Sequence, residues 1–89
     1  MKSNNPVLYT KTGCPWCAEA REVLDRRGIA YTEVNVTTSA TAMTEMKRVS
    51  GQIKAPVLDW AGDVLADFGA SELVPFLDGR AASDRNPVR

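Results

Sequence analysis

The spacing of apolar residues along the chain changes several times, and each change indicates a new element of secondary structure. Val7–Thr10 is a short, β-prone apolar run that leads into the polar segment 11–13, as in a buried strand followed by a loop. From Pro15 the spacing becomes helical, and proline suits the first helical position because its missing N–H needs no partner there. The apolar face of this helix carries Cys17, Ala20, Val23 and Leu24. The Arg-Arg-Gly run at 26–28 is typical of a helix end.

The middle of the chain alternates and then returns to helical spacing. Ala30–Val36 alternates along its length and predicts a second strand. A strand, a helix and a strand within about 30 residues indicate a right-handed parallel crossover. A second helix is expected over about Ala40–Ser50, with Gly51 closing it. Its N-cap candidates are Thr37, Thr38 and Ser39, and its apolar stripe is Ala42, Met46 and Val49.

The last third of the chain predicts a hairpin and a final helix. Pro56–Trp60 and Val64–Ala66 read as two strands joined by a turn at 61–63, where a glycine follows an alanine. The final helix is expected to begin at Gly69 or Ser71 and to end near Asp78. We therefore expect one domain over 1–79 and a loose polar tail over 80–89.

The resulting order, β-α-β-α-β-β-α, predicts an α/β fold. It is the thioredoxin-like arrangement in its smallest form, with a four-stranded mixed sheet and about three flanking helices on its two faces.

Charge and hydropathy bear on whether the protein binds nucleic acid or a membrane. The 89 residues contain eleven Lys and Arg and eleven Asp and Glu, so nothing favours nucleic acid or an anionic membrane as a partner. No apolar run approaches the roughly 20 residues of a membrane-spanning helix, and the first six residues lack the apolar stretch of a signal peptide. We expect a cytoplasmic protein, and a monomer.

The two cysteines are the main candidates for chemistry. They are separated by two residues, and the chain has no histidine. A structural zinc site needs four ligands, which one chain of this composition cannot supply, and no metal is expected. Nucleophilic mechanisms that use a histidine base are excluded as well. A Cys-x-x-Cys run that follows a buried strand and opens a helix within a β-α-β unit favours redox chemistry.

Position gives the two cysteines different roles. The thiolate form attacks disulfides, and Cys14 lies at the predicted N-cap, where backbone N–H groups of Trp16 and Cys17 and the helix dipole favour negative charge. Lys11 adds a cation in the preceding loop. Cys17 lies one turn further in, more buried and outside that field. We expect Cys14 to form a mixed disulfide, which Cys17 or an outside thiol such as glutathione then resolves.

At these residues the sequence resembles the glutaredoxins, and the match runs from about Val7 to Leu77. Tyr9–Cys17 is similar to the family's Y-[ST]-K-x-x-C-P-[YFW]-C signature, and Ser50–Pro56 occupies the place of its S-G-x-x-T-V-P segment. The resemblance implies that Pro56 is a cis-proline facing the active site. It also implies that the backbone of Ala55 pairs with the cysteinyl part of glutathione, as an added strand would.

The resemblance further implies a glutathione site. Its residues are Lys11, Trp16, Gln52, Lys54, Ala55, Pro56, Gly69, Ala70 and Ser71. Two segments depart from the family's pattern. Lys54-Ala55 replaces Thr-Val before the proline, and the segment 68–72 matches the family's G-G-x-D-D run outright only at Gly69 and Glu72. Weaker or altered glutathione binding is expected from the second departure.

Three functions stay open on this resemblance. The first is a glutathione-dependent oxidoreductase that reduces protein disulfides and glutathionylated proteins, with glutathione as reductant and glutathione reductase as an indirect partner. The second is a glutaredoxin-like redoxin, an electron donor recharged by thioredoxin reductase. Ala55-Pro56-Val57 is similar to those redoxins, whereas their active sites usually avoid Cys-Pro-Trp-Cys. The third is an iron–sulfur scaffold, against which Pro15 argues, because cluster-holding glutaredoxins usually lack that proline.

Overall fold

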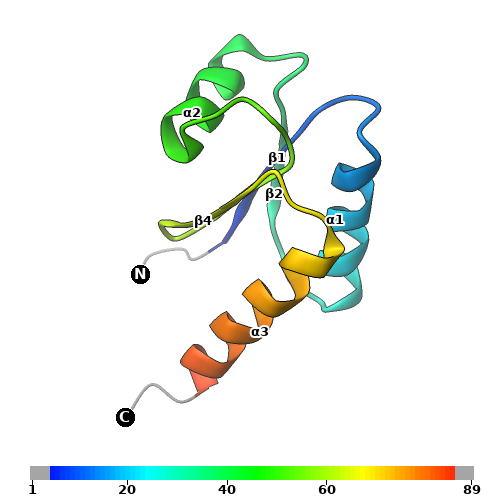
Figure 1. Cartoon of the computed structure of the whole chain (residues 1–89), viewed down its shortest axis with the longest axis vertical. Helices are drawn as coiled ribbons and strands as arrows, with labels where there is room; N and C mark the ends of the chain where they lie inside the picture. Colours follow the sequence, from blue (N-terminus) through cyan, green and yellow to red (C-terminus); the bar gives the residue numbers. More distant parts are fainter. Residues whose placement is uncertain (1–4, 86–89) are drawn as a thin grey trace.

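The computed structural model describes residues 5–85, and the side chains of residues 5–79. Four strands form one sheet in the order β2-β1-β3-β4, with helices packed around it (Figure 1). β1 pairs with β2 in parallel and with β3 in antiparallel orientation, and β3 pairs with β4 in antiparallel orientation. The predicted mixed sheet and the predicted order of elements are confirmed. The strands are β1 (Val7–Thr10), β2 (Thr32–Asn35), β3 (Val57–Trp60) and β4 (Asp63–Ala66), and the helices are α1 (Pro15–Arg26), α2 (Ala40–Ser50) and α3 (Ala70–Arg85).

The sheet separates two apolar clusters. Neighbouring residues of a strand point to opposite faces, so Leu8 packs with α1 and α3 while Tyr9 packs with α2. β3 divides in the same way between Leu58 and Val57. The cluster on the α1 and α3 side contains Leu8, Ala20, Leu24, Leu58, Phe68, Leu73 and Leu77. The two helices on this face therefore hold the loops at their N-terminal ends in fixed positions against the sheet.

Local chemistry sets the helix ends. Ser39 is the N-cap of α2, and its hydroxyl oxygen accepts the N–H of Ala42 at 3.1 Å. Gly51 ends the same helix in a left-handed conformation (φ +73°) and donates its N–H to the carbonyl of Lys47. Of the three predicted N-cap candidates, the structure selects the last. Thr37 has a different partner, described below.

Three strands differ from their predicted lengths, and β3 begins at Val57, one residue later than predicted. The second strand was expected over Ala30–Val36 but spans Thr32–Asn35, because its only partner is β1, which is four residues long. β4 begins at Asp63, so the hairpin turn is the pair Ala61-Gly62, and both residues have positive φ. A two-residue turn of this kind matches the twist of the strands that it joins.

The last helix is longer than predicted. α3 continues past Asp78 to Arg85, so residues 80–85 of the expected tail are helical and the helix crosses the expected domain boundary at 79. Ala81 and Ala82 are strong helix formers. The next proline in the sequence, which disfavours a helical conformation of the residue before it, is Pro87. Residues 86–89 of the expected tail lie outside the described residues. Within residues 5–85, no helix is long and apolar enough to cross a bilayer.

Candidate active site

Cys14 lies at the N-cap of α1, directly after the loop that follows β1. Its backbone is extended, and its Sγ accepts the backbone N–H of Cys17 at 3.2 Å. Of the two N–H groups predicted to face this sulfur, that of Cys17 makes the hydrogen bond. Pro15 follows at the first helical position, as predicted. The sulfur of Cys14 therefore accepts a backbone N–H that has no partner within the helix, at the positive end of the helix dipole.

Cys17 lies in a different environment one turn later. Its side chain is fully buried (0% exposed), between α1 and the sheet. Burial, followed by the hydrogen bond that the Cys17 thiol donates to Cys14, raises the pKa of Cys17 to about 12. The backbone N–H of Lys11 and the charge of Arg21 act in the opposite direction and lower it. With Cys14 reduced, Cys17 is therefore a neutral thiol near pH 7.

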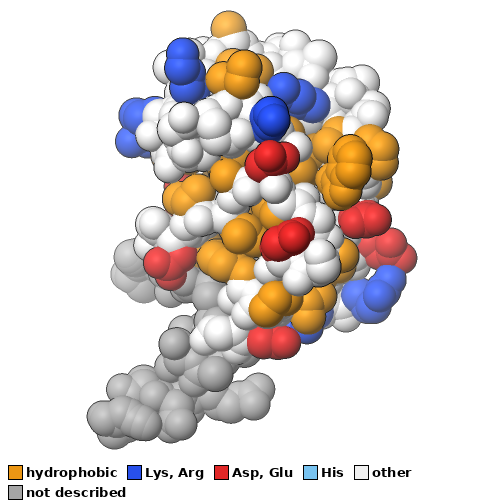
Figure 2. Space-filling view, in the orientation of Figure 1, with side chains coloured by type: hydrophobic (Ala, Val, Ile, Leu, Met, Phe, Trp, Pro, Cys, Tyr) orange, Lys and Arg blue, Asp and Glu red, His pale blue; other side chains and the backbone are white. Residues whose placement is uncertain are grey.

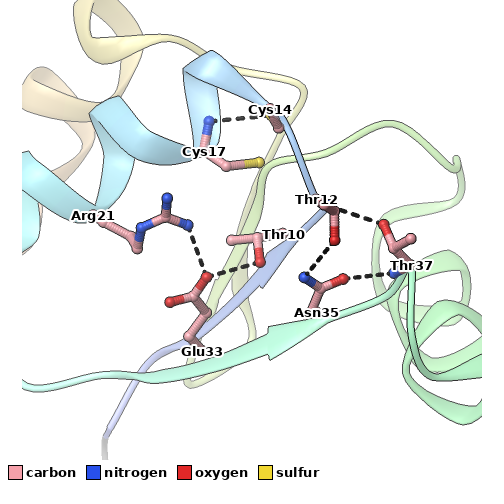
Figure 3. Close-up of polar contacts among 8 residues, drawn as sticks. All are labelled: Thr10, Thr12, Cys14, Cys17, Arg21, Glu33, Asn35 and Thr37. Carbon is pink, nitrogen blue, oxygen red and sulfur yellow. Dashed lines mark hydrogen bonds and ion pairs between the residues drawn. The ribbon is translucent and has the colours of Figure 1, made fainter.

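The loop that carries Cys14 is tied to the far end of β2. The backbone N–H of Thr12 donates to Oγ1 of Thr37 at 3.0 Å, and Nδ2 of Asn35 donates to Oγ1 of Thr12 at 3.1 Å (Figure 3). The N–H of Thr37 in turn donates to Oδ1 of Asn35 at 2.8 Å. The side chains of Thr12, Asn35 and Thr37 thus tie the loop that precedes the N-cap to the end of β2 and to the loop after it.

A second polar group spans β1, β2 and α1 close to Cys17. Oε2 of Glu33 accepts from Oγ1 of the buried Thr10 at 2.9 Å and from Nη1 of Arg21 at 2.8 Å (Figure 3). Arg21 lies four residues after Cys17, on the same side of α1. Glu33 therefore holds the guanidinium that lowers the pKa of Cys17.

An open groove of about 580 Å³ begins at Trp16, two residues after Cys14. It is lined by Trp16 and Glu19 of α1, by Ala55, and by residues 67–72. The Ala55–Pro56 bond is cis, as predicted, and the carbonyl of Pro56 accepts the N–H of Asp67 at 2.9 Å. That hydrogen bond places the segment between β4 and α3 beside the segment that precedes β3.

The groove brings together most of the residues that the sequence assigned to glutathione. Trp16, Ala55, Gly69, Ala70 and Ser71 line it, and Pro56 is buried next to Ala55. Trp16 is 57% exposed.

The other three assigned residues, Lys11, Gln52 and Lys54, do not line the groove. Nε2 of Gln52 donates to Oγ of Ser50 and to the carbonyl of Lys54, and its Oε1 accepts the N–H of Lys54 at 2.8 Å. Both amide hydrogens of Gln52 are thus already donated inside its own loop.

Sequence reasoning missed two of the carboxylates at the groove. Asp67 lines the groove and has a left-handed backbone conformation (φ +54°). Glu19 also lines it, and its Oε1 accepts the N–H of Ala70 at 3.4 Å. Glu19 and Ala70 are 51 residues apart, so no local pattern could have paired them. Glu72 was recognised only as a match to the family's acidic position. Among the described residues, no group of three or more Cys, Asp and Glu side chains is placed to hold a metal ion.

Comparison with known proteins gives one consistent family. The family model described as Glutaredoxin matches residues 7–65. An uncharacterized glutaredoxin-like 8.6 kDa protein of the rubredoxin operon of Clostridium pasteurianum is 30% identical over 66 residues, which are 74% of this chain and 88% of that protein. Glutaredoxin 3 of Escherichia coli is 33% identical over 52 residues, which are 58% of this chain and 63% of that protein.

Solved structures agree with the sequence comparisons. The crystal structure of the thioredoxin-like protein BC3987 superposes with a TM-score of 0.73 at 27% identity, and the match covers 80% of this chain and 97% of that one. The thioredoxin-like fold predicted from the order of the elements is confirmed by this neighbour.

Proposed function

This chain belongs to the glutaredoxin family of thiol–disulfide oxidoreductases, and we propose on that basis that it reduces disulfides through Cys14 and Cys17 with glutathione as the reductant. Its substrates are disulfide-containing proteins and glutathionylated proteins in the cytoplasm, where a reducing pool keeps such dithiols reduced. One observation carries the proposal. A half-exposed cysteine lies at a helix N-terminus, two residues before Trp16, which lines an open groove, and a second cysteine is buried one turn behind it.

The reaction begins at the sulfur of Cys14. Its thiolate attacks one sulfur of a substrate disulfide R–S–S–R′, forms a bond from Cys14 to the R sulfur, and releases R′–S⁻, which takes a proton from the medium. In the second step the thiolate of Cys17 attacks Sγ of Cys14 and releases R–S⁻. The substrate gains two electrons, and the protein is left with a disulfide between its two cysteines.

The first step prepares the second. Once Cys14 is part of a mixed disulfide, its sulfur carries no negative charge. The charge of Cys14 then no longer raises the pKa of Cys17, and the hydrogen bond that Cys17 donates to this sulfur is weakened. Burial is then the main remaining cause that raises the pKa of Cys17, and the Lys11 backbone N–H and the Arg21 charge lower it. Cys17 consequently ionises more readily when there is a mixed disulfide for it to attack.

Glutathione closes the cycle by the same exchange. One glutathione thiolate attacks the Cys14–Cys17 disulfide, and a second releases the first as glutathione disulfide, which glutathione reductase reduces with NADPH. The placement of Trp16, Ala55 and Gly69 around the groove supports a tripeptide thiol bound next to Cys14. Alternatively, glutathione releases a bound substrate directly, without Cys17.

A second candidate, a redoxin recharged by thioredoxin reductase, is favoured by a different observation. The backbone N–H of Gly69 donates to Oε1 of Glu72 at 2.8 Å, and that of Ala70 donates to Glu19. The resemblance to glutaredoxins places Gly69 and Ala70 in the glutathione site. Since the chain's own carboxylates accept from them, binding of glutathione there requires their displacement.

The test compares two reductants on one substrate. Turnover of a glutathione mixed disulfide is followed by NADPH consumption, either with glutathione and glutathione reductase or with thioredoxin reductase, and Cys14→Ser serves as the blank. We expect turnover with glutathione. Turnover with thioredoxin reductase only would replace the first candidate by the second, and no turnover with either would reject both.

A further inference from the structure

The groove beside Cys14 has charged groups of one sign only. Among the described residues that line it, Glu19, Asp67 and Glu72 carry carboxylates, and none is a lysine or arginine. The space-filling view looks onto the segment between β4 and α3 and shows acidic side chains set around exposed apolar surface there (Figure 2). Because the chain as a whole has no net charge, the negative charge of the groove is a local feature and does not follow from the overall composition.

Two of these carboxylates occupy the start of α3. Glu72 accepts the N–H of Gly69, the residue before the helix, which is half of a capping box. Glu19 reaches the next N–H, that of Ala70, from the neighbouring helix α1. A helix N-terminus ordinarily attracts anions. Here the positive end of the dipole is already neutralised, so an incoming carboxylate meets two negative charges instead of free donors.

The third carboxylate is held in place by the backbone. Asp67 has φ +54°, a conformation that aspartate and asparagine tolerate better than most residues. Its N–H is bound to the carbonyl of Pro56 at 2.9 Å. The side chain is therefore presented to the groove by a fixed segment.

The groove also has an aromatic wall next to the carboxylates. The indole of Trp16 is largely exposed and lies against Gly69, where an added Cβ would come within 3.3 Å of the ring carbon Cδ1. Phe68 lines the same groove. An exposed indole beside carboxylates suits the aliphatic stem and charged head of lysine or arginine, since the ring and the carboxylates both attract a cation.

We propose that this groove selects disulfide substrates whose reacting cysteine is flanked by lysine or arginine, and that Glu19, Asp67 and Glu72 set this preference. The inference rests on the proposed function, because the groove matters only if Cys14 attacks the substrate. It adds the class of protein segment that binds next to Cys14. A segment with acidic flanking residues is disfavoured, as like charges meet in the groove.

The test uses three disulfide-linked peptides that differ only in having Lys, Gln or Glu on either side of the cysteine. The rate of reduction of each by the protein is divided by its rate with dithiothreitol, which removes the peptides' own differences in reactivity. At low ionic strength we expect the Lys peptide to be favoured over the Glu peptide by about tenfold, and added salt to reduce that ratio.

Isosteric variants locate the preference. Glu19→Gln, Asp67→Asn and Glu72→Gln together remove the three charges while keeping acceptors for the N–H groups of Gly69 and Ala70. Asparagine also suits the left-handed backbone at 67. The combined variant should reduce the Lys and Glu peptides at equal normalised rates. The matched control, Glu22→Gln, removes an exposed carboxylate of the same helix that is paired with Arg26, and should retain the wild-type ratio.

The outcomes separate this inference from the proposed function. Reduction of the Gln peptide with no preference between Lys and Glu, or a preference that survives in the combined variant, would overturn the inference and leave the oxidoreductase intact. If none of the three peptides is reduced, the proposed function itself fails. The inference stands only if the Lys preference is present, sensitive to salt and lost in the combined variant.

Discussion

Cys14 and Cys17 are chemically identical residues one helical turn apart, and the structure gives them opposite environments. Cys14 lies at the open end of α1, in contact with a backbone N–H and next to a groove that can hold a substrate. Cys17 is enclosed between the helix and the sheet and is fully buried. A shift of three residues along a helix moves a side chain from the cap to the first buried turn. This difference in position is sufficient to make the sulfur of Cys14 the attacking nucleophile and that of Cys17 the resolving thiol.

The reactivities of the two cysteines depend on different neighbours. At Cys14 the helix end supplies a backbone N–H and the positive end of the dipole, and the neighbouring loop holds the sulfur in place. At Cys17 burial dominates, so the nearby Lys11 backbone and Arg21 set how far the thiol remains from ionisation. Changes around Cys14 should therefore act on substrate attack, and changes around Cys17 on resolution.

The largest effect is expected from Cys14→Ser. Serine is a good N-cap and should keep α1 intact, whereas reduction of every disulfide substrate should fall by at least about a thousandfold. Turnover with a glutathione mixed disulfide and with a protein disulfide measures this, and unchanged far-ultraviolet circular dichroism serves as the folding control. Substantial activity in a folded Cys14→Ser protein would mean that Cys17 can start the reaction.

The next effect is selective. Cys17→Ser should retain reduction of glutathione mixed disulfides, which an outside thiol can resolve. It should slow reduction of protein disulfides by more than about tenfold, because the intramolecular attack is lost. The two assays are run side by side on one preparation. Equal loss in both would contradict the division of roles between the cysteines.

A smaller effect is expected at Arg21, which acts through Cys17. Only the thiolate attacks, so resolution speeds up as the pH rises towards the pKa of Cys17; a higher pKa moves that rise to higher pH. Arg21→Gln removes a charge that lowers this pKa, and should slow resolution at neutral pH about two- to fivefold. Stopped-flow measurement of substrate release from the Cys14 mixed disulfide, as a function of pH, gives both the rate of resolution at neutral pH and the pKa of Cys17.

Arg26→Gln is the matched control for Arg21. Arg26 is also ion-paired to a glutamate, at 2.6 Å, but is not among the groups that shift the pKa of Cys17. Its pH profile should coincide with that of the wild type. If the two variants shift the profile equally, the effect of Arg21 is not specific to Cys17.

The smallest effect is expected in the loop before Cys14. Thr37→Val removes the oxygen that accepts the N–H of Thr12, and should lower the free energy of unfolding by about 1 kcal/mol. Faster hydrogen exchange of the Thr12 amide would report the lost contact directly. Thr38→Val is the control, because the Thr38 hydroxyl makes only a long contact of 3.4 Å to a backbone carbonyl. Unchanged exchange at Thr12 in Thr37→Val would show that the loop needs no such tie.

Much of the fold follows from local patterns. The alternation or run of apolar residues identified each strand, and the positions of Pro15, Ser39 and Gly51 agree with the observed helix ends. What could not be read locally depends on partners. β2 is short because β1 is short, and the sequence of β2 alone does not contain that limit.

The candidate site divides in the same way. The cysteines and Pro56 belong to a contiguous motif and a family segment, and both were identified from the sequence. Glu19 was not, because it reaches the start of α3 across 51 residues of sequence. Asp67 was not, because the segment that carries it is placed at the groove by its hydrogen bond to Pro56. Residues that meet only in the folded chain leave no signal in local spacing. The charge of the groove therefore required the structure.

The difference between the two sulfurs can be measured in a single experiment. The reduced native protein is treated with a limiting amount of iodoacetamide near pH 7, and the peptide that contains both cysteines is sequenced by mass spectrometry at successive times. The account predicts that Cys14 is alkylated at least about a hundredfold faster than Cys17, as expected for an accessible sulfur at a helix N-terminus beside a buried thiol with a raised pKa. Comparable rates at the two sulfurs, or faster labelling of Cys17, would contradict it.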